Sequence, residues 1–176
     1  MNTAVRFLVA LALLSFPVAA GAEVSSGDQP TVEATTIDGE PLDSSDWRGT
    51  VVLVDFWATW CTPCRKSFPF YAKLAQKYDR ENFRVVAVSV DEKRADIVDF
   101  LDEFDVPFDV VHDADHTLAE RFEPPTMPTS YLIGPGGTVR EVHEGFRPED
   151  KPTIERRVAD LVADARSAGG STNSKD

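Results

Sequence analysis

Basic side chains are scarce in this sequence, and their scarcity excludes one class of partner. Lysine and arginine number 18 against 30 aspartates and glutamates, which gives a formal net charge of −12 at pH 7. A chain this acidic, without a basic patch, repels nucleic acid and anionic lipid surfaces. We therefore expect no nucleic-acid partner, and a solvated acidic surface is sufficient to explain the charge.

Long apolar runs are also missing, which argues against a membrane protein. The N-terminal apolar stretch, residues 7–14, is short and is followed by Pro17, whereas a transmembrane helix needs ~20 apolar residues. Arg6 is the only charged residue among the first 22, and residues 20–22 resemble a small-residue cleavage site. This pattern predicts an export signal peptide at residues 1–22. An uncleaved N-terminal membrane anchor is the alternative.

Cysteine is nearly absent, since the 176 residues contain only Cys61 and Cys64. In an oxidising compartment, a lone pair of cysteines is ordinarily a structural disulfide. A disulfide between these two would close a loop of only two intervening residues, and the stabilisation from a disulfide grows with loop length. The spacing therefore favours a redox-active pair over a structural one.

The positions of the cysteines support redox chemistry. Residues 51–57 form a near-continuous apolar, β-branched and aromatic run, which is typical of a central strand covered on both faces. Behind the pair, apolar residues recur at helical spacing at Phe68, Tyr71, Leu74, Ala75 and Tyr78. The cysteines are thus expected at a helix N-terminus, where unpaired N–H groups and the helix dipole favour an anion by about 0.3–1 kcal/mol, and up to ~2 kcal/mol when partly buried.

That stabilisation assigns different roles to the two sulfurs. A stabilisation of the thiolate by ~2 kcal/mol would lower a thiol pKa from ~8.5 to about 7. Stabilising the thiolate stabilises the reduced dithiol and makes the disulfide more oxidising. Cys61, nearer the helix start, is the expected attacking sulfur, and Cys64, one turn further along, is placed to resolve a mixed disulfide.

The remaining pattern is that of a single α/β domain over residues 23–168, followed by a Gly/Ser-rich tail at 169–176 that we expect to be disordered. A strand at 83–90 after the first helix completes a parallel crossover unit. The other expected elements are a hairpin at 31–42, a helix at 95–104, a strand at 106–111, a helix at 118–122, antiparallel strands at 129–133 and 138–142, and a helix at 149–166.

Three motifs in this order resemble the thioredoxin family. Residues 55–64, Asp-Phe-Trp-Ala-Thr-Trp-Cys-Thr-Pro-Cys, are similar to its active-site strand and loop; Pro69 matches its helix-kinking proline; and Met127-Pro128-Thr129 matches its cis-proline loop. The resemblance covers roughly residues 30–166. It implies a thioredoxin-like fold, with a central mixed sheet and helices on both faces.

The N-terminal signal, the Cys-x-Pro-Cys string and an extra helix and strand before the cis-proline loop resemble the TlpA/ResA-like branch of extracytoplasmic thiol:disulfide oxidoreductases. This resemblance implies a bacterial periplasmic or otherwise extracytoplasmic protein that reduces protein disulfides, often in cytochrome c maturation. It further implies a membrane electron-transfer protein that recharges the dithiol. We expect a monomer with no cofactor.

Asp55 interrupts the apolar strand, and burial of its carboxylate should raise its pKa. It is a candidate acceptor for the Cys64 proton; the alternative is an aspartate that finds backbone donors or solvent at the sheet edge. The TlpA/ResA-like branch commonly carries asparagine at this position, whereas cytoplasmic-type thioredoxins carry aspartate.

The substrate-binding candidates are Trp60, Met127 and Pro128. Trp60 is expected to be exposed, whereas Trp57 belongs in the core. The resemblance implies a cis peptide bond before Pro128, with the backbone of Met127 facing Cys61 and pairing with an extended substrate segment.

Other chemistries fit the sequence less well. The long separation between Cys64 and His112 does not match zinc-finger spacing, so His112, His116 and His143 are expected at the surface and no metal site is predicted. A peroxidase motif, Pro-x-x-x-Thr-x-x-Cys, fails because Val54 and Ala58 occupy its first two positions. A thiol oxidase and a copper-binding chaperone of the same fold remain as alternatives to the reductase.

Overall fold

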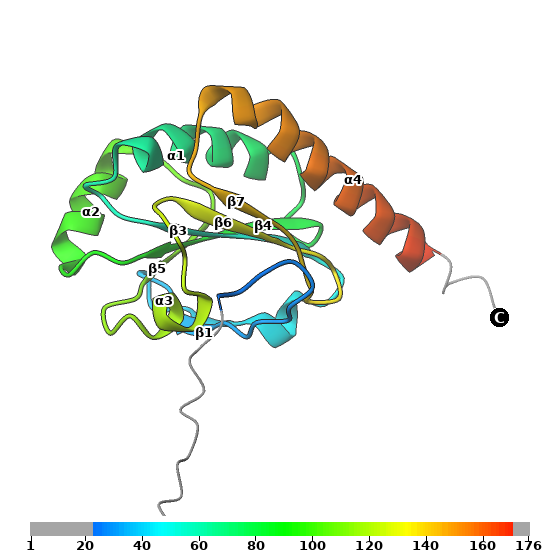
Figure 1. Cartoon of the computed structure of the whole chain (residues 1–176), viewed down its shortest axis with the longest axis horizontal. Helices are drawn as coiled ribbons and strands as arrows, with labels where there is room; N and C mark the ends of the chain where they lie inside the picture. Colours follow the sequence, from blue (N-terminus) through cyan, green and yellow to red (C-terminus); the bar gives the residue numbers. More distant parts are fainter. Residues whose placement is uncertain (1–22, 171–176) are drawn as a thin grey trace, which may run out of the picture.

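The computed structural model describes residues 23–170 (Figure 1). The predicted signal peptide at residues 1–22 lies outside the described residues, as do residues 171–176 of the predicted tail. The other two residues of that tail, Gly169 and Gly170, form the last turn of the C-terminal helix.

A five-stranded mixed sheet forms the centre of the fold. Its spatial order is β5-β4-β3-β6-β7. Strand β3 pairs in parallel with β4 on one side and antiparallel with β6 on the other. The strands span Val51–Trp57 (β3), Phe83–Ser89 (β4), Asp109–His112 (β5), Thr129–Ile133 (β6) and Val139–Glu144 (β7). The predicted mixed sheet and the predicted parallel crossover are both confirmed.

Helices cover both faces of this sheet, as predicted. The helices α1 (Thr62–Ala75), α2 (Arg94–Glu103) and α4 (Lys151–Gly170) contribute to one buried cluster, whereas α3 (Thr117–Phe122) contributes to the other. The hairpin of β1 (Glu33–Thr35) and β2 (Pro41–Asp43) packs on the α3 side. Figure 1 shows α1 and α4 on one side of the sheet, with α3 and β1 on the other.

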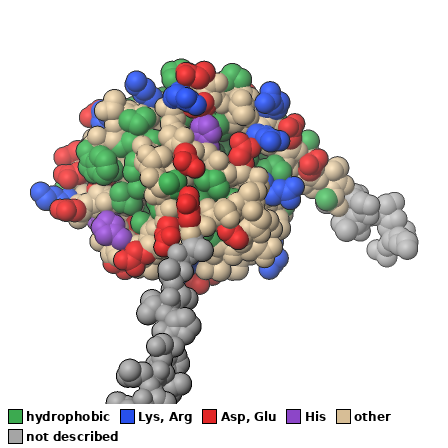
Figure 2. Space-filling model, in the orientation of Figure 1, with side chains coloured by type: hydrophobic (Ala, Val, Ile, Leu, Met, Phe, Trp, Pro, Cys, Tyr) green, Lys and Arg blue, Asp and Glu red, His purple; other side chains and the backbone are tan. Residues whose placement is uncertain are grey.

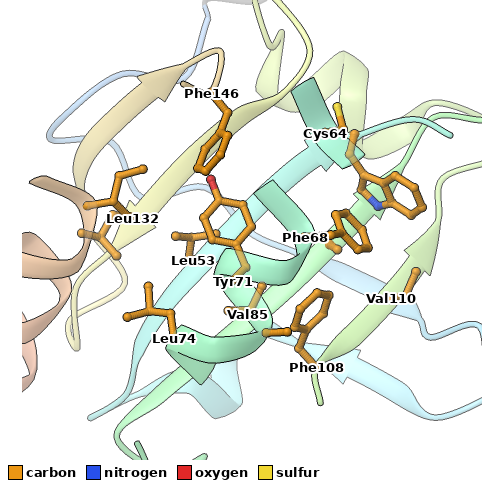
Figure 3. Close-up of a cluster of buried hydrophobic side chains, with 14 of the residues drawn as sticks. Leu53, Cys64, Phe68, Tyr71, Leu74, Val85, Phe108, Val110, Leu132 and Phe146 are labelled. Atoms are coloured by element: carbon orange, nitrogen blue, oxygen red, sulfur yellow. The ribbon is translucent and has the colours of Figure 1, made fainter. Parts of the chain in front are cut away.

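Strand β3 divides the core because its side chains alternate between the two faces. Leu53 and Trp57 pack beneath α1, whereas Val54 and Phe56 point toward α3. Every residue of β3 is buried, which confirms the predicted central strand. In the α1 cluster, drawn in Figure 3, the ring centroids of Trp57 and Phe68 lie 4.3 Å apart.

Some predicted boundaries are wrong by a few residues. The strand expected at 106–111 runs from Asp109 to His112, because Pro107 has no N–H to donate to a sheet ladder. The last helix, expected from residue 149, begins at Lys151 after a 3-10 turn at Pro148–Asp150 and continues to Gly170. Helix ends are the parts of an element that local patterns define least well.

The surface carries charges of both signs. On the face shown in Figure 2, Asp and Glu side chains are spread among scattered Lys and Arg. Among the helices within residues 23–170, none is both long enough and apolar enough to cross a membrane.

Candidate active site

The two cysteines lie where the central strand passes into the first helix. Cys61 is the N-cap residue of α1, and its Sγ accepts a hydrogen bond of 3.3 Å from the backbone N–H of Cys64. The two sulfurs form a disulfide. Cys64 is completely buried, whereas Cys61 retains 4% exposure. The predicted helix N-terminus is therefore confirmed, and Cys61 is the less buried of the two cysteines.

The two tryptophans flanking the loop have opposite environments. Trp60 is 70% exposed, whereas Trp57 is fully buried against Phe68 and Phe100. Both predicted placements are confirmed. An exposed indole directly before Cys61 provides a flat apolar surface beside the disulfide.

The cis-proline loop lies at the same edge of the sheet as the cysteines. The peptide bond between Met127 and Pro128 is cis, as the family resemblance implied. Thr129 pairs with Phe56 in the register of β6 and β3, so the loop before it lies beside the C-terminal end of β3. Met127 is partly buried and packs against both core clusters.

Asp55 is buried in the middle of the sheet. It stands in the β3 register opposite Ala87 of β4 and Ser130 of β6, and it has no exposed surface. Neither carboxylate oxygen has a hydrogen-bond partner among the described residues. Desolvation therefore raises the pKa of the Asp55 carboxyl well above its ordinary value. The alternative of an edge aspartate satisfied by backbone donors or solvent is excluded.

The chain and its fold are similar to known proteins. A family model described as the AhpC/TSA family matches residues 27–142. The chain belongs to this family. The ResA thiol-disulfide oxidoreductase of Bacillus subtilis (strain 168) is 34% identical over 134 residues, which cover 75% of each protein. A second ResA, from Oceanobacillus iheyensis, is 35% identical over 109 residues, covering 62% of this chain and 57% of that protein.

The fold is also similar to that of a solved structure. A candidate thiol:disulfide interchange protein DsbE from Chlorobium tepidum superposes with a TM-score of 0.75 at 37% identity, covering 80% of this chain and 99% of that one. Together with the Cys61–Cys64 pair, these likenesses identify the protein as a thioredoxin-like thiol:disulfide oxidoreductase of the ResA/DsbE type.

Sequence reasoning missed one polar cluster that holds the active-site loop of this family member. The buried carboxylate of Asp91, just after β4, accepts hydrogen bonds from the backbone N–H of Thr59 at 2.9 Å and from its hydroxyl at 2.7 Å. Ser89 Oγ donates to the same carboxylate at 2.7 Å. The signal available in the sequence was an acidic residue directly after a parallel strand, the end where α/β sites gather.

The histidines are less exposed than predicted. His116 is exposed, but His112 and His143 are only partly so. One His112 ring nitrogen, Nε2, lies 2.8 Å from the backbone carbonyl of Asp91, and His143 Nε2 lies 3.3 Å from Asp150 Oδ2. The expectation of three surface histidines is therefore wrong for two of them, because tertiary contacts cover both rings. No group of three metal-ligating side chains gathers in the part of the chain that the structure describes.

Proposed function

We propose that this protein reduces disulfide bonds in extracytoplasmic proteins, with Cys61 as the attacking sulfur and Cys64 as the resolving sulfur. The observation that carries the proposal is the difference between the two sulfurs. Cys61 caps α1 and retains 4% exposure, whereas Cys64 is completely buried. A substrate disulfide therefore meets Cys61 first, at the positive end of a helix dipole.

The reaction balances in two exchange steps. The Cys61 thiolate attacks a substrate disulfide, forms a mixed disulfide and releases one substrate sulfur, which takes up a proton. Cys64 then loses its proton and attacks Cys61 Sγ, which forms the Cys61–Cys64 disulfide and releases the second substrate sulfur as a thiolate that also takes up a proton. Two electrons pass from the protein dithiol to the substrate, which leaves as a dithiol.

Asp55 is the proposed acceptor for the Cys64 proton. It lies on the face of β3 that α1 covers, because it is two residues from both Leu53 and Trp57, which pack in the same cluster as Cys64. Burial raises its pKa and so makes its carboxylate form a stronger base than an exposed carboxylate.

Trp60, Met127 and Pro128 are the proposed substrate-binding surface. Changing Trp60 to alanine should weaken binding of a protein substrate about 5–30-fold, the equivalent of 1–2 kcal/mol, because exposed aromatic side chains often dominate such contacts. The free energy of unfolding should change by less than about 0.5 kcal/mol. Steady-state kinetics with a protein disulfide and with a small disulfide measure this effect, because only the protein substrate should bind more weakly to Trp60→Ala.

The matched control for Trp60→Ala is Val98→Ala. Val98, on α2, is the other large exposed hydrophobic side chain within residues 23–168. Val98→Ala should leave the kinetics with both the protein disulfide and the small disulfide unchanged. Equal losses for Trp60→Ala and Val98→Ala would contradict a binding surface centred on Trp60.

The reduction potential of the Cys61–Cys64 pair decides the direction of electron flow. Thr62 and Pro63 between the cysteines supply no cation to stabilise a thiolate. The reduction potential, measured by equilibration with glutathione, should lie closer to that of thioredoxin at about −270 mV than to that of strong exported oxidants at about −120 mV. A value near the second figure would assign the protein as a thiol oxidase.

The proposal has four further parts: export, a membrane electron-transfer partner that recharges the dithiol, a role in cytochrome c maturation, and a monomeric state. The apolar N-terminal segment with its small-residue site supports export. The relatives named ResA support the oxidoreductase class. Fractionation of the native host, followed by thiol trapping of the protein with and without its membrane fraction, tests location and recharging together.

A further inference from the structure

The active-site loop is a tight turn whose middle residues are Thr59 and Trp60. The backbone N–H of Cys61 donates a hydrogen bond of 3.1 Å to the carbonyl of Ala58, which closes the turn between β3 and α1. Trp60 is exposed on this turn, whereas Cys61 is almost covered. The position of the turn therefore sets where the indole and the attacking sulfur lie.

A buried carboxylate holds this turn from the neighbouring strand. Asp91 lies two residues after the end of β4 and is 3% exposed. Its Oδ2 accepts a hydrogen bond of 2.9 Å from the backbone N–H of Thr59, and its Oδ1 accepts one of 2.7 Å from the Thr59 hydroxyl. Both carboxylate oxygens thus bind one residue of the turn, two positions before Cys61.

Asp91 is itself fixed to the sheet. The hydroxyl of Ser89, the last residue of β4, donates to Asp91 Oδ2 at 2.7 Å and accepts from the Asp91 backbone N–H at 3.1 Å. From β5, His112 Nε2 lies 2.8 Å from the Asp91 carbonyl, which can only accept, so the ring N–H donates. The carboxylate accepts from both Thr59 and Ser89, and this set of donors suits an ionised group. Its charge is therefore held in a fixed place behind the turn.

The fixed turn favours the disulfide over the dithiol. It keeps the Cys61 sulfur close to that of Cys64, with which it forms the disulfide. Two groups held in reactive geometry combine more readily than two free ones. A pair whose disulfide is favoured is harder to reduce, which means that its dithiol is a stronger reductant.

The charge of Asp91 acts in the same direction. The short path through Thr59 and the turn places the carboxylate roughly 10 Å from the Cys61 sulfur. A negative charge at this distance disfavours the thiolate and so opposes the helix dipole. A less stable thiolate means a less stable dithiol, which is again a stronger reductant. The first turn of α1 contains no acidic side chain, so this charge comes from outside the helix.

We propose that Asp91 is a positioning residue that keeps the Cys61–Cys64 pair reducing, through the two hydrogen bonds that its carboxylate accepts from Thr59. It acts through Thr59 rather than on a sulfur. The inference rests on the proposed function, because it takes the dithiol as the electron donor. Removing the charge of Asp91, or a bond between Asp91 and Thr59, should therefore make the pair more oxidising.

Asp91→Asn keeps the shape of the side chain and removes its charge. Equilibration with glutathione buffers, followed by alkylation of free thiols, measures the balance between dithiol and disulfide. The equilibrium constant should shift toward the dithiol about 2–15-fold, the range for one charge roughly 10 Å away at effective dielectric constants of about 80 to 20. At ~30 mV per tenfold change, this shift equals about 10–35 mV. The ultraviolet absorbance of the Cys61 thiolate should also appear at lower pH. A shift of less than about 1.5-fold would overturn the proposal.

Thr59→Val and Thr59→Ser test the hydrogen bonds without changing a charge. Thr59→Val loses the hydroxyl bond to Asp91 Oδ1 and keeps the backbone bond to Oδ2. It should shift the glutathione equilibrium toward the dithiol by at least about twofold, because hydrogen bonds to charged groups are stronger than neutral ones. Thr59→Ser retains the hydroxyl and should match the unsubstituted protein. Equal potentials in Thr59→Val and Thr59→Ser would contradict an action of Asp91 through Thr59.

Asp113→Asn is the matched control for Asp91→Asn. Asp113 directly follows β5, it is 4% exposed, and its carboxylate accepts hydrogen bonds of 3.0 and 2.8 Å from the backbone N–H groups of Leu118 and Ala119 in α3. Asp113→Asn should lower the free energy of unfolding about as much as Asp91→Asn, but it should shift the glutathione equilibrium far less, because its bonds go to α3. An equal shift in both variants would reveal a general effect of destabilisation and defeat the proposal.

The potential of the unsubstituted protein separates this inference from the proposed function. If that potential is reducing and Asp91→Asn leaves it unchanged, only the role of Asp91 is wrong. If that potential lies at the oxidising end and Asp91→Asn still shifts it as expected, the reductase assignment is wrong, while the effect of Asp91 on the pair stands.

Discussion

Replacing Cys64 with serine is expected to stop the protein at a mixed disulfide with its substrate. Cys61 retains its position at the N-cap of α1 and still attacks, but serine cannot break the resulting disulfide because a hydroxyl is not ionised near neutral pH. Turnover should fall at least about a thousandfold, the scale seen when a covalent nucleophile is lost. Nonreducing electrophoresis of the variant expressed in its native host should show a substrate adduct that disappears on reduction.

Cys61→Ser is the control for this experiment. It should be equally inactive but form no adduct, because the remaining Cys64 sulfur is completely buried. An adduct that forms through Cys64 in Cys61→Ser, and is absent from Cys64→Ser, would reverse the assigned roles.

Changing Asp55 to asparagine is expected to stabilise the protein, and to do so more as the pH rises. The folded pKa of Asp55 is raised by burial, so above about pH 4, the unfolded pKa, the folded state holds a proton that the unfolded state has lost. Stability of the unsubstituted protein therefore falls, relative to Asp55→Asn, by up to about 1.4 kcal/mol per pH unit until the pH passes the folded pKa.

Urea unfolding of the disulfide form from about pH 2 to pH 8 measures this difference, because the two sulfurs do not titrate while they are joined. Asp43→Asn is the control of opposite sign. A hydrogen bond from the backbone N–H of Ser45 lowers the pKa of exposed Asp43, so its contribution to stability is lost as the pH falls through that lowered pKa. A difference between the unsubstituted protein and Asp55→Asn that does not vary with pH would show that the carboxyl is not buried as described.

The parts of the site that lie close together in the chain could be predicted from the sequence. The apolar run of β3, the cysteines after it and the helical spacing after them occupy one continuous stretch, and a helix N-terminus depends on local backbone geometry. Trp57 and Trp60 were placed correctly for the same reason. The cis bond before Pro128 was predicted only through family resemblance, because local chemistry gives a cis proline a frequency of about 5–6%.

The contacts around the loop and the carboxyl could not be predicted in the same way. Thr59 and Asp91 are separated by 32 positions, and Tyr71 and Ser130 by 59. Periodicity shows which face of its own element a residue occupies, but it does not give the register between strands. For the same reason, His112 and His143 were expected at the surface although neighbouring elements partly cover them.

Local patterns in the chain are therefore enough to show that a cysteine pair begins a helix after a buried strand, which is the basis of the redox chemistry. The burial of Asp55 in a central strand, without hydrogen-bond partners among the described residues, and the contact between Tyr71 and Ser130 depend on the three-dimensional arrangement. A helix dipole arises within one segment, whereas burial and cross-strand neighbours depend on how distant segments align.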